Sequence, residues 1–466
     1  MNLTSQQQAL LDGAKGPAMA KVVKTLVMYG ECFGAERMVP VTGANGHLVT
    51  SFGLSMLGPV YDLMDELLKD GALSGQSFSV DPRPLDPAVP ANPLQKLLFK
   101  IMYSKQDDYE AQLRSMGLLD NDAFTCTCYQ PEVGNRPRRG DILSWAESSA
   151  VVFANSVLGA RCNRNSGIIE MFGSIAGFVP EFGLLTDEGR KATWIIEVDC
   201  KRKPEAQVLG SAIGMKVMED VHYIKGLDRW LGRELTPGTQ DYLKDMGAAS
   251  ASNGAVGLYH VDGITPEAVE QGEHLIALDA QIYRIDDAEL ERIRSSYPVM
   301  WKNPGARPKL AFIGCPHLSS AQLAHWADAI CDGLSASGKC RVQVPTVLTA
   351  APSVADAFRK TAAYRRLSTT GAVVSSICPL MYTNNPLCGS MPIITNSNKL
   401  RTYSASRYYT DDEVLAYVTT GKPIKSEGDS SWKKSFTAAS LSPELPTPRH
   451  LSLTEGSTRS HRFRRH

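Results

Sequence analysis

The sequence predicts an α/β fold in which parallel sheets are covered by helices on both faces. In the last third of the chain, short apolar segments alternate with segments of helical periodicity, which is typical of parallel sheets. The composition is that of an ordinary globular protein, with 43% hydrophobic and 21% charged residues. A chain of 466 residues is long enough to contain several such α/β units.

The predicted helices have apolar residues at helical spacing, and two of them follow a serine that can cap the first turn. They span residues 6–11, 57–68, 94–118, 144–158, 207–217, 286–296, 319–334, 354–364 and 411–419. The predicted strands are short apolar runs at residues 193–199, 255–261, 309–314, 341–348, 371–377 and 391–395. Proline and glycine are frequent in residues 79–93 and 125–140, so we expect loops there.

Charge and hydropathy exclude two classes of partner. Lys and Arg together number 49, as do Asp and Glu, and a nucleic-acid-binding protein usually has a basic excess. No apolar run approaches the roughly 18 residues of a membrane-spanning helix. With no signal-like N-terminus, we expect a cytoplasmic protein without nucleic-acid or membrane partners. Residues 422–466 contain nine Lys or Arg, four Pro and many Ser, which predicts a disordered basic tail.

Two cysteines stand in the same local context. Cys315 and Cys378 each follow a predicted strand and precede a proline. The carboxyl ends of parallel strands meet at one edge of a sheet, where ligands bind. Cysteine thiolates hold iron–sulfur clusters, and Cys-Pro is a known ligand context. The residues therefore favour a cluster site, with a buried structural role for both cysteines as the alternative.

The irregular segment that begins at residue 125 contains a third candidate position for a cysteine ligand. Cys126 and Cys128 are both candidates. Side chains two residues apart in an extended segment point to the same side, so the residue pattern leaves this choice open.

Polar side chains among apolar or small neighbours form further candidates. A buried polar group is costly unless it is paired, so these residues either bind the carboxylate and hydroxyl groups of a ligand or form an internal network of caps and salt bridges. They are Glu147, Ser148, Ser149, Asn155, Ser156, Arg161, Asn163, Asn396, Ser397 and Lys399. Lys399 follows a predicted strand and can hold an anion. His47, His222 and His317 lack the spacing of zinc ligands, and we expect structural roles for them.

Several stretches together resemble the catalytic large chain of the aconitase X family. The matching motifs are Thr125-Cys126-Thr127, Gly134-Asn135-Arg136-Pro137, Glu147-Ser148-Ser149-Ala150-Val151, Ala154-Asn155-Ser156-Val157-Leu158-Gly159-Ala160-Arg161, Gly314-Cys315-Pro316-His317, Ile377-Cys378-Pro379, Thr395-Asn396-Ser397 and Lys399. The resemblance covers residues 1–421, which would form a catalytic domain of several α/β subdomains. In this family the ligand stands at the position of Cys126, and Cys128 stands where proline is usual. Cys162 replaces a common threonine.

The resemblance implies stacked α/β/α layers with parallel sheets around a central cluster, of the [4Fe-4S] or [2Fe-2S] type. It implies metal ligation by Cys126, Cys315 and Cys378, catalytic roles for Glu147, Ser148, Ser149 and Lys399, and substrate binding by Asn155, Ser156, Arg161, Asn163, Asn396 and Ser397. The implied activity is that of a hydro-lyase acting on a small hydroxy acid. We expect cis-3-hydroxy-L-proline, with mevalonate 5-phosphate as the alternative substrate and a non-catalytic cluster-binding scaffold as the alternative role. A separate small subunit is expected to supply the swivelling domain that closes the site.

Overall fold

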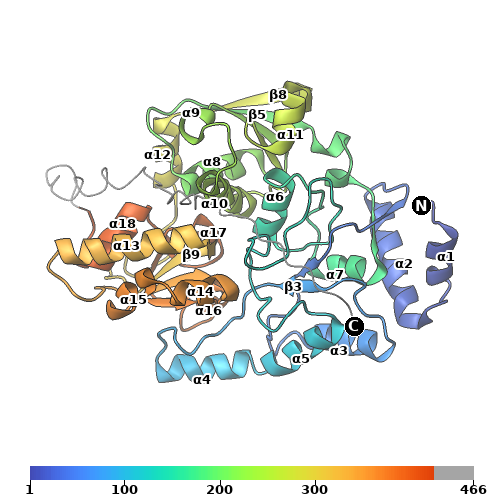
Figure 1. The fold of residues 1–466 in the computed structure, drawn as a ribbon, viewed down its shortest axis with the longest axis horizontal. Helices are drawn as coiled ribbons and strands as arrows, with labels where there is room; N and C mark the ends of the chain where they lie inside the picture. Colours follow the sequence, from blue (N-terminus) through green and yellow to red (C-terminus); the bar gives the residue numbers. More distant parts are fainter. Residues whose placement is uncertain (425–466) are drawn as a thin grey trace, which may run out of the picture. The chain divides into compact units, whose positions relative to one another are not determined.

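Two sheets, each parallel throughout, organise the structure, a computed structural model that describes residues 1–424 (Figure 1). One sheet has the strand order β11-β10-β9-β12-β13 and the other has the order β7-β6-β5-β8. Their strands are β5 (Ala192–Val198), β6 (His222–Lys225), β7 (Tyr259–Val261), β8 (Ile276–Ile285), β9 (Leu310–Leu318), β10 (Thr346–Ala350), β11 (Val373–Ser375), β12 (Ile393–Thr395) and β13 (Arg407–Tyr408). The predicted α/β class is confirmed. The predicted tail lies outside the described residues from residue 425 onward.

The first 190 residues carry only short strands among helices. β1 (Met38–Pro40) pairs antiparallel with β4 (Phe178–Pro180), and β2 (Gly46–Leu48) pairs in parallel with β3 (Phe78–Val80). The helices are α1 (Ser5–Leu11), α2 (Gly16–Cys32), α3 (Gly58–Lys69), α4 (Pro93–Met102), α5 (Gln106–Met116), α6 (Ser148–Ser156) and α7 (Gly167–Ala176). The apolar faces of α1, α2, α3, α5 and α7 share one core with β3 and its neighbours, whereas α4 and α6 pack into two other cores.

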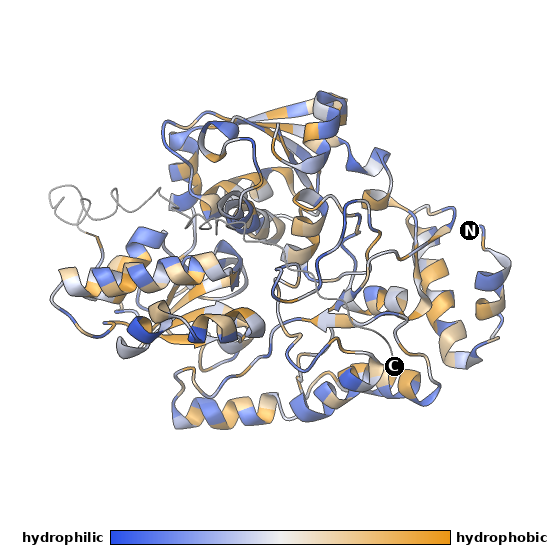
Figure 2. Cartoon of the chain, viewed as in Figure 1, coloured by the Kyte–Doolittle hydropathy of each residue, from blue (hydrophilic) through white to orange (hydrophobic). Residues whose placement is uncertain are grey.

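Helices cover both of the larger sheets. They are α8 (Ala206–Val217), α9 (Asp228–Leu231), α10 (Pro237–Asn253), α11 (Pro266–Gln271), α12 (Asp287–Ser295), α13 (Ser320–Ala336), α14 (Pro352–Arg359), α15 (Ala362–Thr369), α16 (Pro379–Thr383), α17 (Asn398–Tyr403) and α18 (Asp411–Thr420). Three 3₁₀ helices lie at Gly183–Leu185, Glu188–Arg190 and Gly272–Leu275. Hydrophobic residues concentrate on the strands, whereas helices such as α4 and α13 also carry hydrophilic residues (Figure 2). Within residues 1–424, every helix is too short or too polar to span a bilayer.

Helix boundaries differ from the predictions where tertiary contacts override local pattern. The predicted helix at 94–118 is two helices, α4 and α5, because the chain turns at Tyr103, whose hydroxyl donates to Met381 O at 2.8 Å. The predicted helix at 354–364 begins in α14 and ends in α15. Helix α10 was not predicted, because it is buried along most of its length and therefore lacks an amphipathic pattern.

Close backbone approach explains the glycines of α8. A Cβ atom at Gly210 would lie 2.1 Å from Met246 O, so α8 and α10 pack with their backbones nearly in contact. This packing forms the core between the four-stranded sheet and α6.

Candidate active site

Cys315 lies in an irregularity near the carboxyl end of β9. The pairing of β9 with β10 is regular up to Ile313 and shifts register before Leu318. Gly314 has a φ of +101°, and a Cβ atom there would lie 2.6 Å from Leu318 Cγ and 2.7 Å from Thr349 O, so the position requires glycine. The bulge leaves Cys315 buried at the sheet edge.

Cys378 and Lys399 follow two other strands of the same sheet. Cys378 comes after β11 and is the residue immediately before α16, and its N–H donates to Arg83 O at 2.8 Å. Lys399 lies in the first turn of α17, directly after β12. Both residues therefore lie at the carboxyl edge of the five-stranded sheet, where the sequence predicted them.

A short parallel sheet in the first half of the chain supplies residues in the same way. Besides the β2–β3 pair, isolated parallel bridges join His47 to Trp145 and Val80 to Phe124. The residues that follow these parallel segments lie at one edge, and they are Asp81, Cys126 and Glu147. The strands are only three residues long, so their pattern could not be read from the sequence.

One buried imidazole joins the three segments that carry the predicted metal ligands. His317, two residues after Cys315, has Nδ1 at 3.0 Å from Thr125 Oγ1 and Nε2 at 3.1 Å from Ile377 O. Its backbone N–H donates to Cys126 Sγ at 3.4 Å. A carbonyl oxygen only accepts, so Nε2 carries the ring proton and Nδ1 accepts from the Thr125 hydroxyl. Burial lowers the pKa of His317 to about 4, which keeps the ring neutral.

The three thiols fit an iron–sulfur cluster. Burial raises the pKa of each of Cys126, Cys315 and Cys378, the charge of Cys315 contributes to the shift of both others, and Lys399 opposes the shift at all three. No three His, Cys, Asp or Glu side chains within residues 1–424 are spaced to bind one metal ion. Cysteine ligands of a cluster bind different irons, so they need not converge on one point. The backbone N–H of His317, which donates to Cys126, and the Lys399 ammonium both stabilise negative charge. A cluster held by thiolates carries such charge.

Cys128 occupies a different environment from Cys126. Its side chain is fully buried in the hydrophobic core that contains Tyr129 and Leu143. Burial raises the pKa of its thiol, and the charge of Glu147 raises it further. The charge of Cys315 therefore acts on the thiol of Cys126, whereas the thiol of Cys128 interacts with Ser79 and Asp81.

A buried ion pair lies beside the thiols. The Lys399 ammonium donates to Glu147 Oε1 and, at 3.1 Å, to Ser149 Oγ. Glu147 Oε2 accepts from Ala150 N at 2.6 Å and from Ser149 Oγ at 2.7 Å, which caps α6. Burial raises the pKa of Glu147, but Lys399 and these hydrogen bonds outweigh it and lower the pKa to about 2. Burial lowers the pKa of Lys399, and Glu147 with the thiols of Cys315 and Cys126 holds it above its ordinary value.

The remaining candidates near Lys399 have local roles. Ser397 donates to Cys315 O and accepts from Leu400 N at 3.1 Å, so it caps α17 and fixes the cysteine segment. Asn396 donates to Asp411 Oδ1 at 2.8 Å on the exposed side. Ser148 is half-buried, and its side chain makes no hydrogen bond within residues 1–424.

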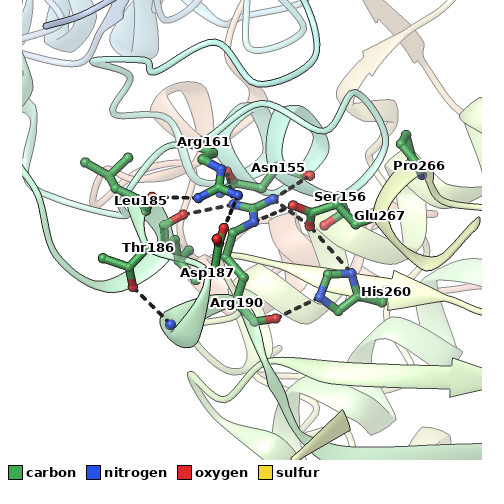
Figure 3. A network of polar contacts seen from close by, with 12 residues as sticks. Asn155, Ser156, Arg161, Leu185, Thr186, Asp187, Arg190, His260, Pro266 and Glu267 are labelled. Atoms are coloured by element: carbon green, nitrogen blue, oxygen red, sulfur yellow. Dashed lines mark hydrogen bonds and ion pairs between the residues drawn. The ribbon is translucent and has the colours of Figure 1, made fainter. Parts of the chain in front are cut away.

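Four residues that the sequence predicted to bind substrate lie away from the Glu147–Lys399 pair, in or beside a second polar network (Figure 3). Asn155 and Ser156 end α6, about 12 Å along the helix from Glu147. Their side chains, with those of Arg161 and Asn163, bond to the protein itself. Their polar atoms hold loops of the chain in place, and their predicted role around a ligand stays a prediction. The sequence pattern marked them as buried and polar but could not identify their partners.

Arg190 is the centre of that network. Its guanidinium donates to both oxygens of Glu267 at 2.8 and 2.9 Å, to Leu184 O at 2.9 Å, and to Asn155 at 3.3 and 3.4 Å. All five N–H groups therefore have an acceptor. His260 donates to the carbonyl of Arg190 at 2.9 Å, which completes the connection to β7.

Sequence reasoning missed two polar residues beside the ion pair, Asp81 and Arg164. Arg164 makes no hydrogen bond or ion pair within residues 1–424, and its Nη1 atom is buried. Burial lowers its pKa, while the charges of Tyr403 and Glu147 act in the opposite direction, which places the guanidinium near the ion pair. It lies one residue after Asn163, so the motif that marked that segment could have found it.

A cavity of about 360 Å³ reaches the cysteine segment from the side of α8 and α10. Its lining includes Cys315 and Asn396 but none of the other predicted site residues. It therefore lies beside the ion pair and the other two cysteines rather than around them.

Comparisons with known proteins find similar chains over most of the sequence. Three family models match the chain, described as the aconitase X first, second and third domains, over residues 1–188, 192–295 and 308–414. A phosphomevalonate dehydratase large subunit of Thermococcus kodakarensis is 32% identical over 412 residues, which cover 87% of this chain and 95% of that one. A cis-3-hydroxy-L-proline dehydratase of Pseudomonas aeruginosa is 29% identical, and the match covers 86% of this chain and 66% of that one. The crystal structure of Thermococcus kodakaraensis aconitase X in its holo-form matches with a TM-score of 0.71 and 29% identity, covering 90% of this chain and 100% of that one.

Proposed function

The chain belongs to the aconitase X family, and from this premise we propose that it is an iron–sulfur-dependent hydro-lyase that dehydrates a small hydroxy acid. The observation that carries the proposal is the convergence of the Cys126, Cys315 and Cys378 segments on His317, next to the Glu147–Lys399 pair. A cluster held by the three thiolates supplies, when bound, a Lewis-acidic iron for the departing hydroxyl. Its nuclearity, two or four irons, is left open by the donor set.

The side chains of this chain bind and orient the acid. Lys399 is held in place by Glu147 and Ser149, so its ammonium presents a fixed positive charge beside Cys315. Arg164 is a cation without an anionic partner among the described residues, and a guanidinium suits a carboxylate. We assign the substrate carboxylate to Arg164, with Glu147, Ser148, Ser149 and Lys399 as the groups next to the reacting carbons. Asn155, Ser156, Arg161 and Asn163 are assigned to the structural network.

For the substrate we favour cis-3-hydroxy-L-proline, a zwitterion, over mevalonate 5-phosphate. A phosphate ester and a carboxylate together require several free cations, but Glu147 already pairs with Lys399. The loop after Cys378 is polar rather than basic. Sequence identity favours mevalonate 5-phosphate, because the Thermococcus kodakarensis relative with 32% identity is named a phosphomevalonate dehydratase large subunit.

A small partner subunit is part of the proposal. The curated relatives from Thermococcus kodakarensis and Methanosarcina mazei are named large subunits. We propose that a second chain closes the site and supplies the group that removes the proton next to the carboxylate.

A two-substrate assay tests this function. The chain is purified anaerobically with the small chain that copurifies, its cluster is reconstituted, and both acids are supplied separately. We expect kcat/KM for cis-3-hydroxy-L-proline to exceed that for mevalonate 5-phosphate by at least about 100-fold, since a wrong charge in the site costs several kcal/mol. Turnover of the phosphate ester alone would overturn the substrate. A loaded protein that, with its partner, dehydrates neither acid would instead favour the cluster-binding scaffold.

A further inference from the structure

Two buried polar atoms face each other without hydrogen-bond partners at the edge of the short parallel sheet. His47 is fully buried on β2, and Asp81, whose side chain is 15% exposed, follows β3. His47 Nε2 lies 3.9 Å from Asp81 Oδ1, which is beyond hydrogen-bonding distance. Within residues 1–424 neither atom has a hydrogen bond. Unpaired buried polar atoms are rare in folded proteins and often mark a ligand position.

Hydrogen bonds hold the ring of His47 in place on the side away from Asp81. Asn135 Nδ2 donates to Gly46 O and to Ser79 Oγ, both at 2.8 Å. His47 Nδ1 lies 2.9 Å from Ser79 Oγ, and its Nε2 atom is the one that faces Asp81. Burial lowers the pKa of His47 to about 4, so the imidazole is neutral and does not neutralise the carboxylate.

The Asp81 carboxyl lies within the electrostatic reach of the candidate active site. Its charge acts on the pKa of both Cys378 and Cys315. Burial raises the pKa of Asp81 well above its ordinary value, the charge of Glu147 raises it further, and the charge of Lys399 lowers it. The neighbouring cation, Lys399, is engaged by Glu147 and Ser149 rather than by Asp81. Within residues 1–424, Asp81 is therefore an acid near the thiols that no Lys or Arg side chain contacts.

An ammonium group of a ligand would complete this arrangement. A buried carboxylate without a cation is unfavourable, and a positively charged N–H donor removes that penalty while forming a strong hydrogen bond. A phosphate or a second carboxylate at the same place would be repelled.

We propose that Asp81, beside His47, binds the protonated ring nitrogen of the substrate and so selects a hydroxy amino acid over a phosphorylated hydroxy acid. This inference rests on the proposed function and names the residue that binds the ammonium group of the substrate. Arg164 and Asp81 together would match the two opposite charges of a zwitterion. An ordered water molecule between His47 and Asp81 is the competing explanation for the gap.

Binding of two non-reacting probes to the reconstituted protein with its partner chain tests the proposal. L-proline carries an ammonium and a carboxylate, whereas cyclopentanecarboxylate has the same ring size and no nitrogen. By titration calorimetry we expect the wild type to bind L-proline at least about 10-fold more tightly than cyclopentanecarboxylate. In D81N this preference should fall to less than about 2-fold, because the asparagine amide cannot neutralise the ammonium. The surface variant D62N, on α3, should retain the wild-type preference.

Turnover gives a second and separable result. D81N should raise KM for cis-3-hydroxy-L-proline by about 10- to 100-fold and should keep the wild-type iron content. An unchanged probe preference and KM in D81N would overturn the inference in favour of a bridging water, while the proposed function stands. Loss of iron in D81N would also overturn it, because Asp81 would then belong to the metal site. A wild type that turns over neither acid would instead refute the proposed function.

Discussion

Replacing Lys399 with methionine is expected to inactivate the protein and to destabilise it. The variant K399M leaves the buried carboxylate of Glu147 without its cation, and such a broken pair costs about 3–5 kcal/mol. The loss of the fixed positive charge beside Cys315 should lower kcat by at least about 100-fold. Urea denaturation followed by circular dichroism, together with the dehydration assay, measures both effects.

The double variant E147Q/K399M separates the energy of the Glu147–Lys399 ion pair from the loss of the lysine side chain itself. Glutamine carries no charge, so the double variant should be more stable than K399M alone, which gives a coupling energy for the pair. The surface variant K21M removes one member of the exposed Lys21–Glu66 pair and should change stability by less than about 1 kcal/mol. Equal stability of K399M and the wild type would contradict the buried pair that is central to this site.

Replacing Arg190 with methionine is expected to cause the second large effect, on stability rather than on chemistry. Arg190 is 1% exposed, and all its donors are used by Glu267, Asn155 and Leu184 (Figure 3). R190M leaves Glu267 buried and unpaired, which should lower the unfolding free energy by about 3–5 kcal/mol. KM of the remaining folded protein should be unchanged, because this network lies at the far end of α6.

The neighbouring Arg161–Asp187 pair provides a matched control for R190M. Asp187 is 89% exposed, so D187N should lower stability by less than about 1 kcal/mol. A large rise of KM in folded R190M would contradict the structural role and would return Asn155 and Arg161 to the substrate site.

The sequence predicted the parts of the site that depend on local pattern. Cys378 and Lys399 follow apolar strands of the five-stranded sheet, Cys315 lies near the carboxyl end of another, and strand ends can be read from a few residues. The choice of Cys126 over Cys128 required the family resemblance, which the three domain matches confirm at the level of the family. Ligation by Cys126 itself stays a prediction.

Long-range pairing could not be predicted. Glu147 and Lys399 are 252 residues apart, and no local pattern shows that each neutralises the other. For the same reason Asn155 was predicted to bind substrate, although its partners Arg190 and Gly257 lie 35 and 102 residues away. Asp81 was missed because β3 has only three residues, too few to show a strand period.

The central claim is that Cys126, Cys315 and Cys378 hold an iron–sulfur cluster, and iron and acid-labile sulfide content tests it most directly. The measurement uses anaerobically purified wild type, C126S and C128S. We predict iron and sulfide in the wild type and in C128S, and loss of most of both in C126S. A wild type without iron or sulfide after reconstitution, or a C126S variant that keeps its full content while C128S loses it, would contradict this claim.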